Sequence, residues 1–149
     1  MSNFVTHYHP VWPSDTVILA DLSPYGMPGR FEQFWATRTA NGSFRISCIP
    51  FFTYGIALGD TVECDRELTI QKIVKKDHHK TLRVALADKQ DGKHLHEVLH
   101  KWADETNLSY EWYADGYLAV DLPPNSDAQL NMSLLDKLSD KGDISFEID

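Results

Sequence analysis

The sequence predicts an α+β protein in which a small antiparallel β-sheet or barrel, residues 1–77, packs on a ferredoxin-like βαββαβ unit, residues 78–149. Short β-prone runs separated by turn residues fill the first half of the chain. In the second half, strand patterns alternate with two helical patterns. The 149 residues, 42% of them hydrophobic, suffice for one domain or for two small subdomains that share a core.

The first half is predicted to contain about five short strands. A loop rich in proline and glycine follows the first strand, and Asn41-Gly42 is a strong signal for a hairpin turn. Polar turns separate the remaining strands, as in small curled sheets and barrels. The predicted strands cover residues 17–20, 30–39, 43–49, 61–64 and 68–74.

The second half has the order strand, helix, strand, strand, helix, strand. Residues 94–106 are predicted to be helical, because Leu95, Val98, Leu99 and Trp102 follow the spacing of one helix face. A second helix is predicted from Ser126 or Asp127, with Leu130, Leu134, Leu135 and Leu138 inward and Gly142 near its end. The predicted strands cover residues 81–87, 110–114, 117–122 and 144–148.

Composition and charge exclude several classes of function. A formal net charge of -8 argues against binding to nucleic acid through phosphate contacts, but it suits a protein that neutralises a basic partner. The first residues lack the pattern of a secretory signal, and no apolar run is long enough to span a membrane, so we expect a cytoplasmic protein. Cys48 and Cys64 are predicted to be reduced, buried strand residues. No Walker loop or dinucleotide fingerprint is present, and we expect no cofactor.

His96-Glu97-Val98-Leu99-His100 matches the H-E-x-x-H pattern of zinc metalloproteases. Both imidazoles share a helix face, but that face is one residue away from the buried stripe, on the flank of the helix. The positions that would supply glycine and a third ligand in the extended pattern hold Ala103 and Thr106. We therefore interpret the motif as a solvated polar flank and predict no metal site.

The stretch from residue 49 to residue 60 is unusually aromatic. Pro50 cannot donate to a sheet ladder, and Phe51, Phe52 and Tyr54 follow it closely. Such density favours packing between the two subdomains over a recognition surface. Asp60 follows Gly59 and is predicted to accept hydrogen bonds from turn amides.

This stretch also resembles a known family motif. Residues 49–63 are similar to the IPFF-x-YG-x-x-x-GD-x-V segment of an uncharacterised bacterial family of domains of unknown function. Phe34-Trp35 and the LAVDLPP segment, residues 118–124, fit the same resemblance. The resemblance implies a small, acidic, cytosolic domain without enzymatic activity, of a kind suspected to act as immunity proteins in contact-dependent or polymorphic toxin systems.

We therefore expect a non-catalytic immunity protein that covers a basic toxin, such as a nuclease, with an acidic surface. Two alternatives stay open: a small-molecule-sensing module with a pocket between the two halves, and a zinc-dependent hydrolase through His96, Glu97 and His100. The predicted contacts with the toxin are exposed carboxylates with nearby tyrosines, namely Asp104, Glu105, Glu111, Tyr113, Asp115 and Tyr117.

Overall fold

The predicted α+β class is confirmed by two sheets and two α-helices in the described part of the chain. The structure, a computed structural model, describes residues 3–87 and 92–149. The chain divides into two units, unit 1 (Met1–His79) and unit 2 (Lys80–Asp149). No helix among the described residues is long and apolar enough to cross a membrane.

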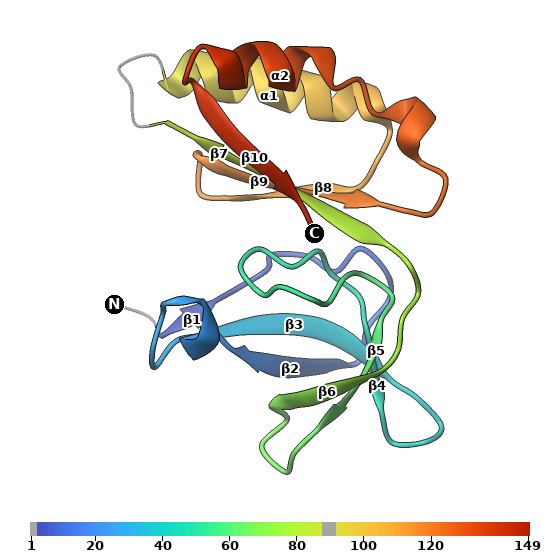
Figure 1. The fold of residues 1–149 in the computed structure, drawn as a ribbon. Helices are drawn as coiled ribbons and strands as arrows, with labels where there is room; N and C mark the ends of the chain where they lie inside the picture. The colour runs from blue at the N-terminus through green and yellow to red at the C-terminus, as the bar shows by residue number, and fades with distance from the viewer. Residues whose placement is uncertain (1–2, 88–91) are drawn as a thin grey trace. The chain divides into compact units, whose positions relative to one another are not determined.

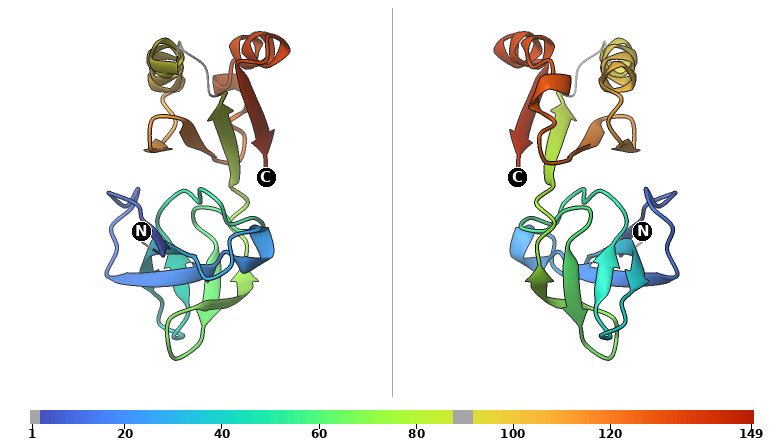
Figure 2. Two further views of the ribbon diagram at one scale, coloured as in Figure 1. Left: turned by 90° about the vertical axis from the view of Figure 1, so that its left-hand side faces the viewer. Right: turned by 90° about the vertical axis from the view of Figure 1, so that its right-hand side faces the viewer.

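Unit 1 is a six-stranded sheet that curls back on itself (Figures 1 and 2). The strand β3 is its centre, with β2 on one edge and both β1 and β4 on the other. The pairing continues through β5 to β6, and a bridge between Leu19 and Thr69 links β6 to β2. The strands are β1 (Phe4–Val5), β2 (Thr16–Asp21), β3 (Phe31–Arg38), β4 (Phe44–Ile46), β5 (Thr61–Cys64) and β6 (Ile70–Lys75), and a short 3-10 helix, η1 (Ser23–Tyr25), follows β2.

The core of unit 1 follows the two-residue period of its strands. Alternate residues of β3 point inward, and Phe34 and Ala36 are fully buried with residues of the neighbouring strands. The buried hydrophobic cluster is Ile18, Ala20, Phe34, Ala36, Phe44, Ile46, Cys48, Ile56 and Val62.

Unit 1 corrects the prediction in two places. The strand β1 was not predicted, and it pairs with β3 in parallel, so the sheet is not wholly antiparallel. The strand predicted over residues 43–49 ends at Ile46, which leaves Cys48 in a loop. Pro50 has no amide hydrogen, and the amides of the next three residues bond to a side chain of β3, so this segment forms no ladder.

Unit 2 is a four-stranded antiparallel sheet in the order β10-β7-β9-β8. Both α-helices lie side by side on one of its faces (Figures 1 and 2). Leu82 and Val84 of the central strand β7 pack against Leu95 and Leu99 of α1 in the buried cluster. The elements are β7 (Lys80–Leu86), α1 (Gly92–Thr106), β8 (Tyr110–Tyr113), β9 (Tyr117–Leu122), the 3-10 helix η2 (Asp127–Gln129), α2 (Ser133–Asp140) and β10 (Ile144–Ile148).

The start of the second helix was predicted wrongly. It begins at Ser133, whereas Asp127 opens only the short turn η2. The Asn131 side-chain oxygen accepts hydrogen bonds from the amide and the hydroxyl of Ser133, and Leu130 is extended. This local bonding ends the turn and starts a separate helix.

Candidate functional site

The two histidines of the HEVLH motif lie on the flank of α1, as the spacing predicted, and they pack against side chains of β8. Their ring centroids are 6.0 Å apart. The Trp112 ring lies 4.0 Å from His96, and Tyr110 meets His100 edge-on at 5.7 Å. Both aromatic residues also pack against the buried core of unit 2, so the histidines cover the edge of that core.

Hydrogen bonds hold the two histidines in opposite tautomers. His96 Nδ1 lies 3.0 Å from the carbonyl oxygen of Asp115, which can only accept, so Nδ1 carries the proton and Nε2 has the lone pair. The indole nitrogen of Trp112 can only donate, and it donates to His100 Nδ1 at 3.2 Å. His100 therefore carries its proton on Nε2, 3.6 Å from a carboxylate oxygen of Asp104.

This arrangement does not suit the zinc hypothesis. A metal ion needs an unprotonated nitrogen from each histidine, and here the only lone pair of neutral His100 is used by Trp112. Among residues 3–87 and 92–149, no three His, Cys, Asp or Glu side chains are placed to hold a metal ion. The third ligand that a zinc-dependent hydrolase would require is thus not found in the described part of the chain.

The six predicted contact residues are divided between different surfaces of unit 2. Asp104 and Glu105 lie on the exposed side of α1. On β8, Tyr110 and Trp112 face the helices, so Glu111, which alternates with them, faces the other side of the sheet. Tyr113 and Tyr117 are cross-strand partners on that same side, and Asp115 lies in the turn between β8 and β9.

Asp104 is tied into the histidine flank. Its carboxylate accepts a short hydrogen bond from the hydroxyl of Tyr110. Burial, together with the adjacent Asp104 carboxylate, raises the pKa of Tyr110 to about 12, so this hydroxyl keeps its proton at neutral pH. Asp104 is therefore a positioned carboxylate, whereas Glu105 has only a marginal pairing with Lys101 at 4.0 Å.

The negative charge of the chain is concentrated in unit 2. Residues 1–79 contain eight Asp or Glu against seven Lys or Arg, a net of -1. Residues 80–149 contain fourteen Asp or Glu against seven Lys or Arg, a net of -7. Nearly the whole acidic excess thus belongs to the unit that contains the predicted contacts.

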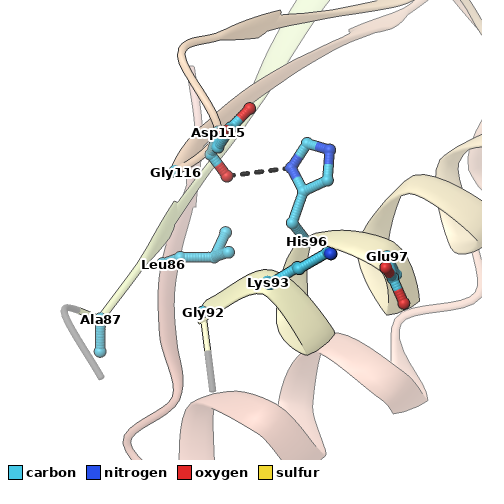
Figure 3. Close-up of a pocket in the computed structure, with 8 residues that line it drawn as sticks. All are labelled: Leu86, Ala87, Gly92, Lys93, His96, Glu97, Asp115 and Gly116. Atoms are coloured by element: carbon cyan, nitrogen blue, oxygen red, sulfur yellow. Dashed lines mark hydrogen bonds between the residues drawn. The ribbon is translucent and has the colours of Figure 1, made fainter. Parts of the chain in front are cut away.

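A pocket of about 630 Å³ lies at the beginning of α1 (Figure 3). The strand β7, the first turns of α1 and the β8–β9 turn contribute to it. Its described lining residues are Leu86, Ala87, Gly92, Lys93, His96, Glu97, Asp115 and Gly116. Only His96, Glu97 and Asp115 were singled out from the sequence, because nothing in the local pattern marks Lys93 as a neighbour of β7.

The aromatic segment of unit 1, residues 49–60, is held by hydrogen bonds to a buried carboxylate. Glu32 is fully buried on β3, and its two oxygens accept hydrogen bonds from the amides of Phe51, Phe52 and Thr53 and from the Thr53 hydroxyl. His7 Nε2 lies 2.8 Å from the same carboxylate, and its ring stacks on Phe51 at 4.3 Å. Burial alone would raise the pKa of Glu32, but His7 and the amides outweigh it, so the pKa is lowered.

Sequence reasoning did not identify Glu32 or His7. The sequence did contain a signal for Glu32. Side chains alternate along a strand, so Glu32 points to the same inner side as Phe34 and Ala36, which places a carboxylate at a core position. Asp60 behaves as predicted: fully buried, it accepts hydrogen bonds from the amides of Ala57 and Asp77. The motif is therefore a structural element, in which buried carboxylates bind loop amides.

Both cysteines are free, as predicted. Cys48 is buried in the loop after β4, and Cys64 is half-buried at the end of β5. Burial and the neighbouring Asp65 raise the pKa of Cys64 to about 11. Its thiol is therefore almost entirely protonated near neutral pH and is a poor nucleophile.

Comparison with known proteins identifies a family and a fold. Residues 32–146 match the model of a family described as Domain of unknown function (DUF4265). A solved structure, described as a novel crystal structure of a hypothetical protein from Neisseria gonorrhoeae, is 21% identical over 95% of both chains, with a TM-score of 0.66. At this identity the likeness concerns the fold alone. No curated protein matches the sequence.

Proposed function

We propose that this chain, which belongs to the DUF4265 family of domains of unknown function, is a non-catalytic protein-binding domain. In this proposal it acts as an immunity protein that neutralises a cognate toxin by covering it with an acidic surface. The observation that carries the proposal is the confinement of the acidic excess to unit 2, with a net charge of -7 against -1 in unit 1.

Charge complementarity gives the chemistry of the partner. An enzyme that cleaves nucleic acid needs a basic cleft to hold phosphates, and a strongly acidic surface is attracted to such a cleft. The exposed carboxylates of Asp104 and Glu105 on α1 are the proposed centre of this surface. Asp104 is held in place by Tyr110, which lowers the entropy lost when a partner binds.

The proposal includes a ferredoxin-like arrangement for unit 2. The antiparallel order β10-β7-β9-β8 and the two helices on one face support it. This arrangement leaves the outer side of α1 and the edge strand β8 at the surface of the unit. A cytoplasmic location follows from the proposal, because a nuclease toxin acts on nucleic acid inside the cell.

The test is native mass spectrometry of the tagged full-length chain, purified gently from its own cells. We expect a one-to-one complex with a basic polypeptide that dissociates as salt is raised, since salt screens surface charges. Neutralising Asp104→Asn and Glu105→Gln together should weaken this complex, with circular dichroism confirming the fold.

The matched control removes two exposed carboxylates from unit 1, Glu63→Gln and Glu67→Gln. It should leave the complex unchanged. Equal loss of binding in both double variants would show that net charge alone matters and that α1 is not the binding surface. A chain that carries stoichiometric zinc and no polypeptide would contradict the proposal.

A further inference from the structure

The pocket at the beginning of α1 has the composition of a small-ligand site. Its volume of about 630 Å³ lies within the usual range for such sites. Leu86 and Ala87 of the β7 segment give it an apolar side, and α1 contributes Lys93, His96 and Glu97 (Figure 3). Apolar surface with a few polar groups from one rigid element is typical of a binding site for a small molecule.

Three polar groups of α1 remain available at this pocket. Within the described residues, neither the Lys93 ammonium nor the Glu97 carboxylate forms an ion pair, whereas Lys101 and Glu105, at the same spacing, approach to 4.0 Å. A lysine four residues before a glutamate is the less favourable order for pairing on a helix. His96 Nε2 is the third group. Because Nδ1 carries the proton and donates it to the Asp115 carbonyl, the lone pair on Nε2 is not used in that bond.

His96 is also held rigidly. Its Nδ1 donates to the Asp115 carbonyl, and its ring packs on Trp112 at 4.0 Å and beside His100. A ligand that donates a hydrogen bond to Nε2 would therefore meet an acceptor whose tautomer and orientation are already set. Such preorganisation reduces the cost of binding.

We infer that this pocket binds a small zwitterion, a free α-amino acid with an apolar side chain. Lys93 would bind the ligand's carboxylate, and Glu97 would bind its ammonium group. His96 Nε2 would accept one ammonium hydrogen, and Leu86 and Ala87 would contact the apolar side chain. A cation and an anion one helical turn apart, with a neutral acceptor on the same helix at the same pocket, match the charges of this class of ligand. The inference is independent of the proposed toxin partner.

The test is titration of the full-length chain with L-leucine, followed by the backbone amide signals of Lys93, His96 and Gly116 in 1H-15N NMR spectra. We expect saturable shifts at these amides at millimolar concentrations. Two probes lack one charge each: 4-methylpentanoate has no ammonium group, and 3-methylbutylamine has no carboxylate. Each should bind about tenfold more weakly or worse than L-leucine.

Variants on α1 provide the matched comparison. Lys93→Ala and Glu97→Gln should each weaken L-leucine binding by about tenfold or more, because each removes a charge-assisted contact. Lys101→Ala and Glu105→Gln repeat the same changes on the same helix, outside the lining of this pocket, and should leave the affinity unchanged.

Three results would overturn the inference. The first is the absence of shifts at these amides at roughly 10 mM L-leucine. The second is equal or tighter binding of either singly charged probe, which would make the ligand an acid or an amine. The third is binding that persists unchanged in both pocket variants.

Discussion

The buried carboxylate of Glu32 should be a main source of stability in unit 1. Its two oxygens accept hydrogen bonds from three loop amides, from the Thr53 hydroxyl and from His7. The substitution Glu32→Gln keeps the shape of the side chain but replaces one oxygen with an NH2 group, which can only donate. The variant therefore removes charge and one acceptor without creating a cavity.

The expected cost can be worked out from the contacts. If the glutamine oxygen keeps the bonds to Phe52 and Thr53, its NH2 group faces the Phe51 amide, now 2.6 Å from the carboxylate. One buried donor is then unsatisfied, which costs about 1–3 kcal/mol, and the remaining bonds lose their charge assistance. Breaking a buried ion pair costs about 3–5 kcal/mol in total, and we expect a loss in this range.

The assay is amide hydrogen exchange of β3 and β4 at neutral pH, with the amides of unit 2 as an internal reference. The control is Glu63→Gln, the same chemical change at a half-exposed side chain paired with Lys72 at 3.4 Å. We expect it to cost less than about 1 kcal/mol. If Glu32→Gln lowers the free energy of unfolding no more than the control does, the hydrogen bonds of Glu32 to the loop amides are not a main source of stability in unit 1.

The effect of pH gives an independent check on Glu32. Its pKa is lower in the folded chain than its usual value of 4.5, so its contribution to stability is complete above that value. The contribution is lost as the pH falls through the lower, folded pKa. The difference in unfolding free energy between the wild type and Glu32→Gln should therefore shrink as the pH is lowered below 4.5, and a difference that grows would contradict the sign.

Three further predictions concern single residues. Gly59→Ala should destabilise unit 1 by about 1–3 kcal/mol in urea unfolding, because φ is +93° and a Cβ would lie 2.4 Å from Asp77 Oδ2. The control Gly55→Ala, at φ +80° with open space around the new Cβ, should cost less. Trp112→Phe should shift His100 toward the Nδ1-protonated tautomer, read from its 15N shifts, and an unchanged tautomer would show that Trp112 does not set it. Cys64 should react with iodoacetamide slowly at pH 8 and accelerate up to about pH 11, and rapid labelling at pH 8 would disprove the raised pKa.

The sequence by itself determined most of the secondary structure and the family. Strands and helices whose apolar residues repeat with a clear period, such as β7, α1 and β9, lie close to where the pattern predicted them. The resemblance of the segment around Phe51 and Asp60 predicted membership of a family of domains of unknown function, and residues 32–146 match such a family. Helices, strands and short motifs depend on residues that are close in the sequence, so the order of residues alone can reveal them.

Only the tertiary structure decided which side chains meet. Glu32 reaches the amides of a loop nineteen residues later, and β1 pairs with a strand more than twenty residues away. The spacing of the HEVLH motif puts its two histidines on one helix face, but Trp112 and Asp115, which fix these histidines in opposite tautomers, are brought in by β8 and its turn. The pocket likewise requires β7 to lie beside α1. Hydrogen bonds and pockets form between segments that the fold brings together, and no local period encodes such pairings.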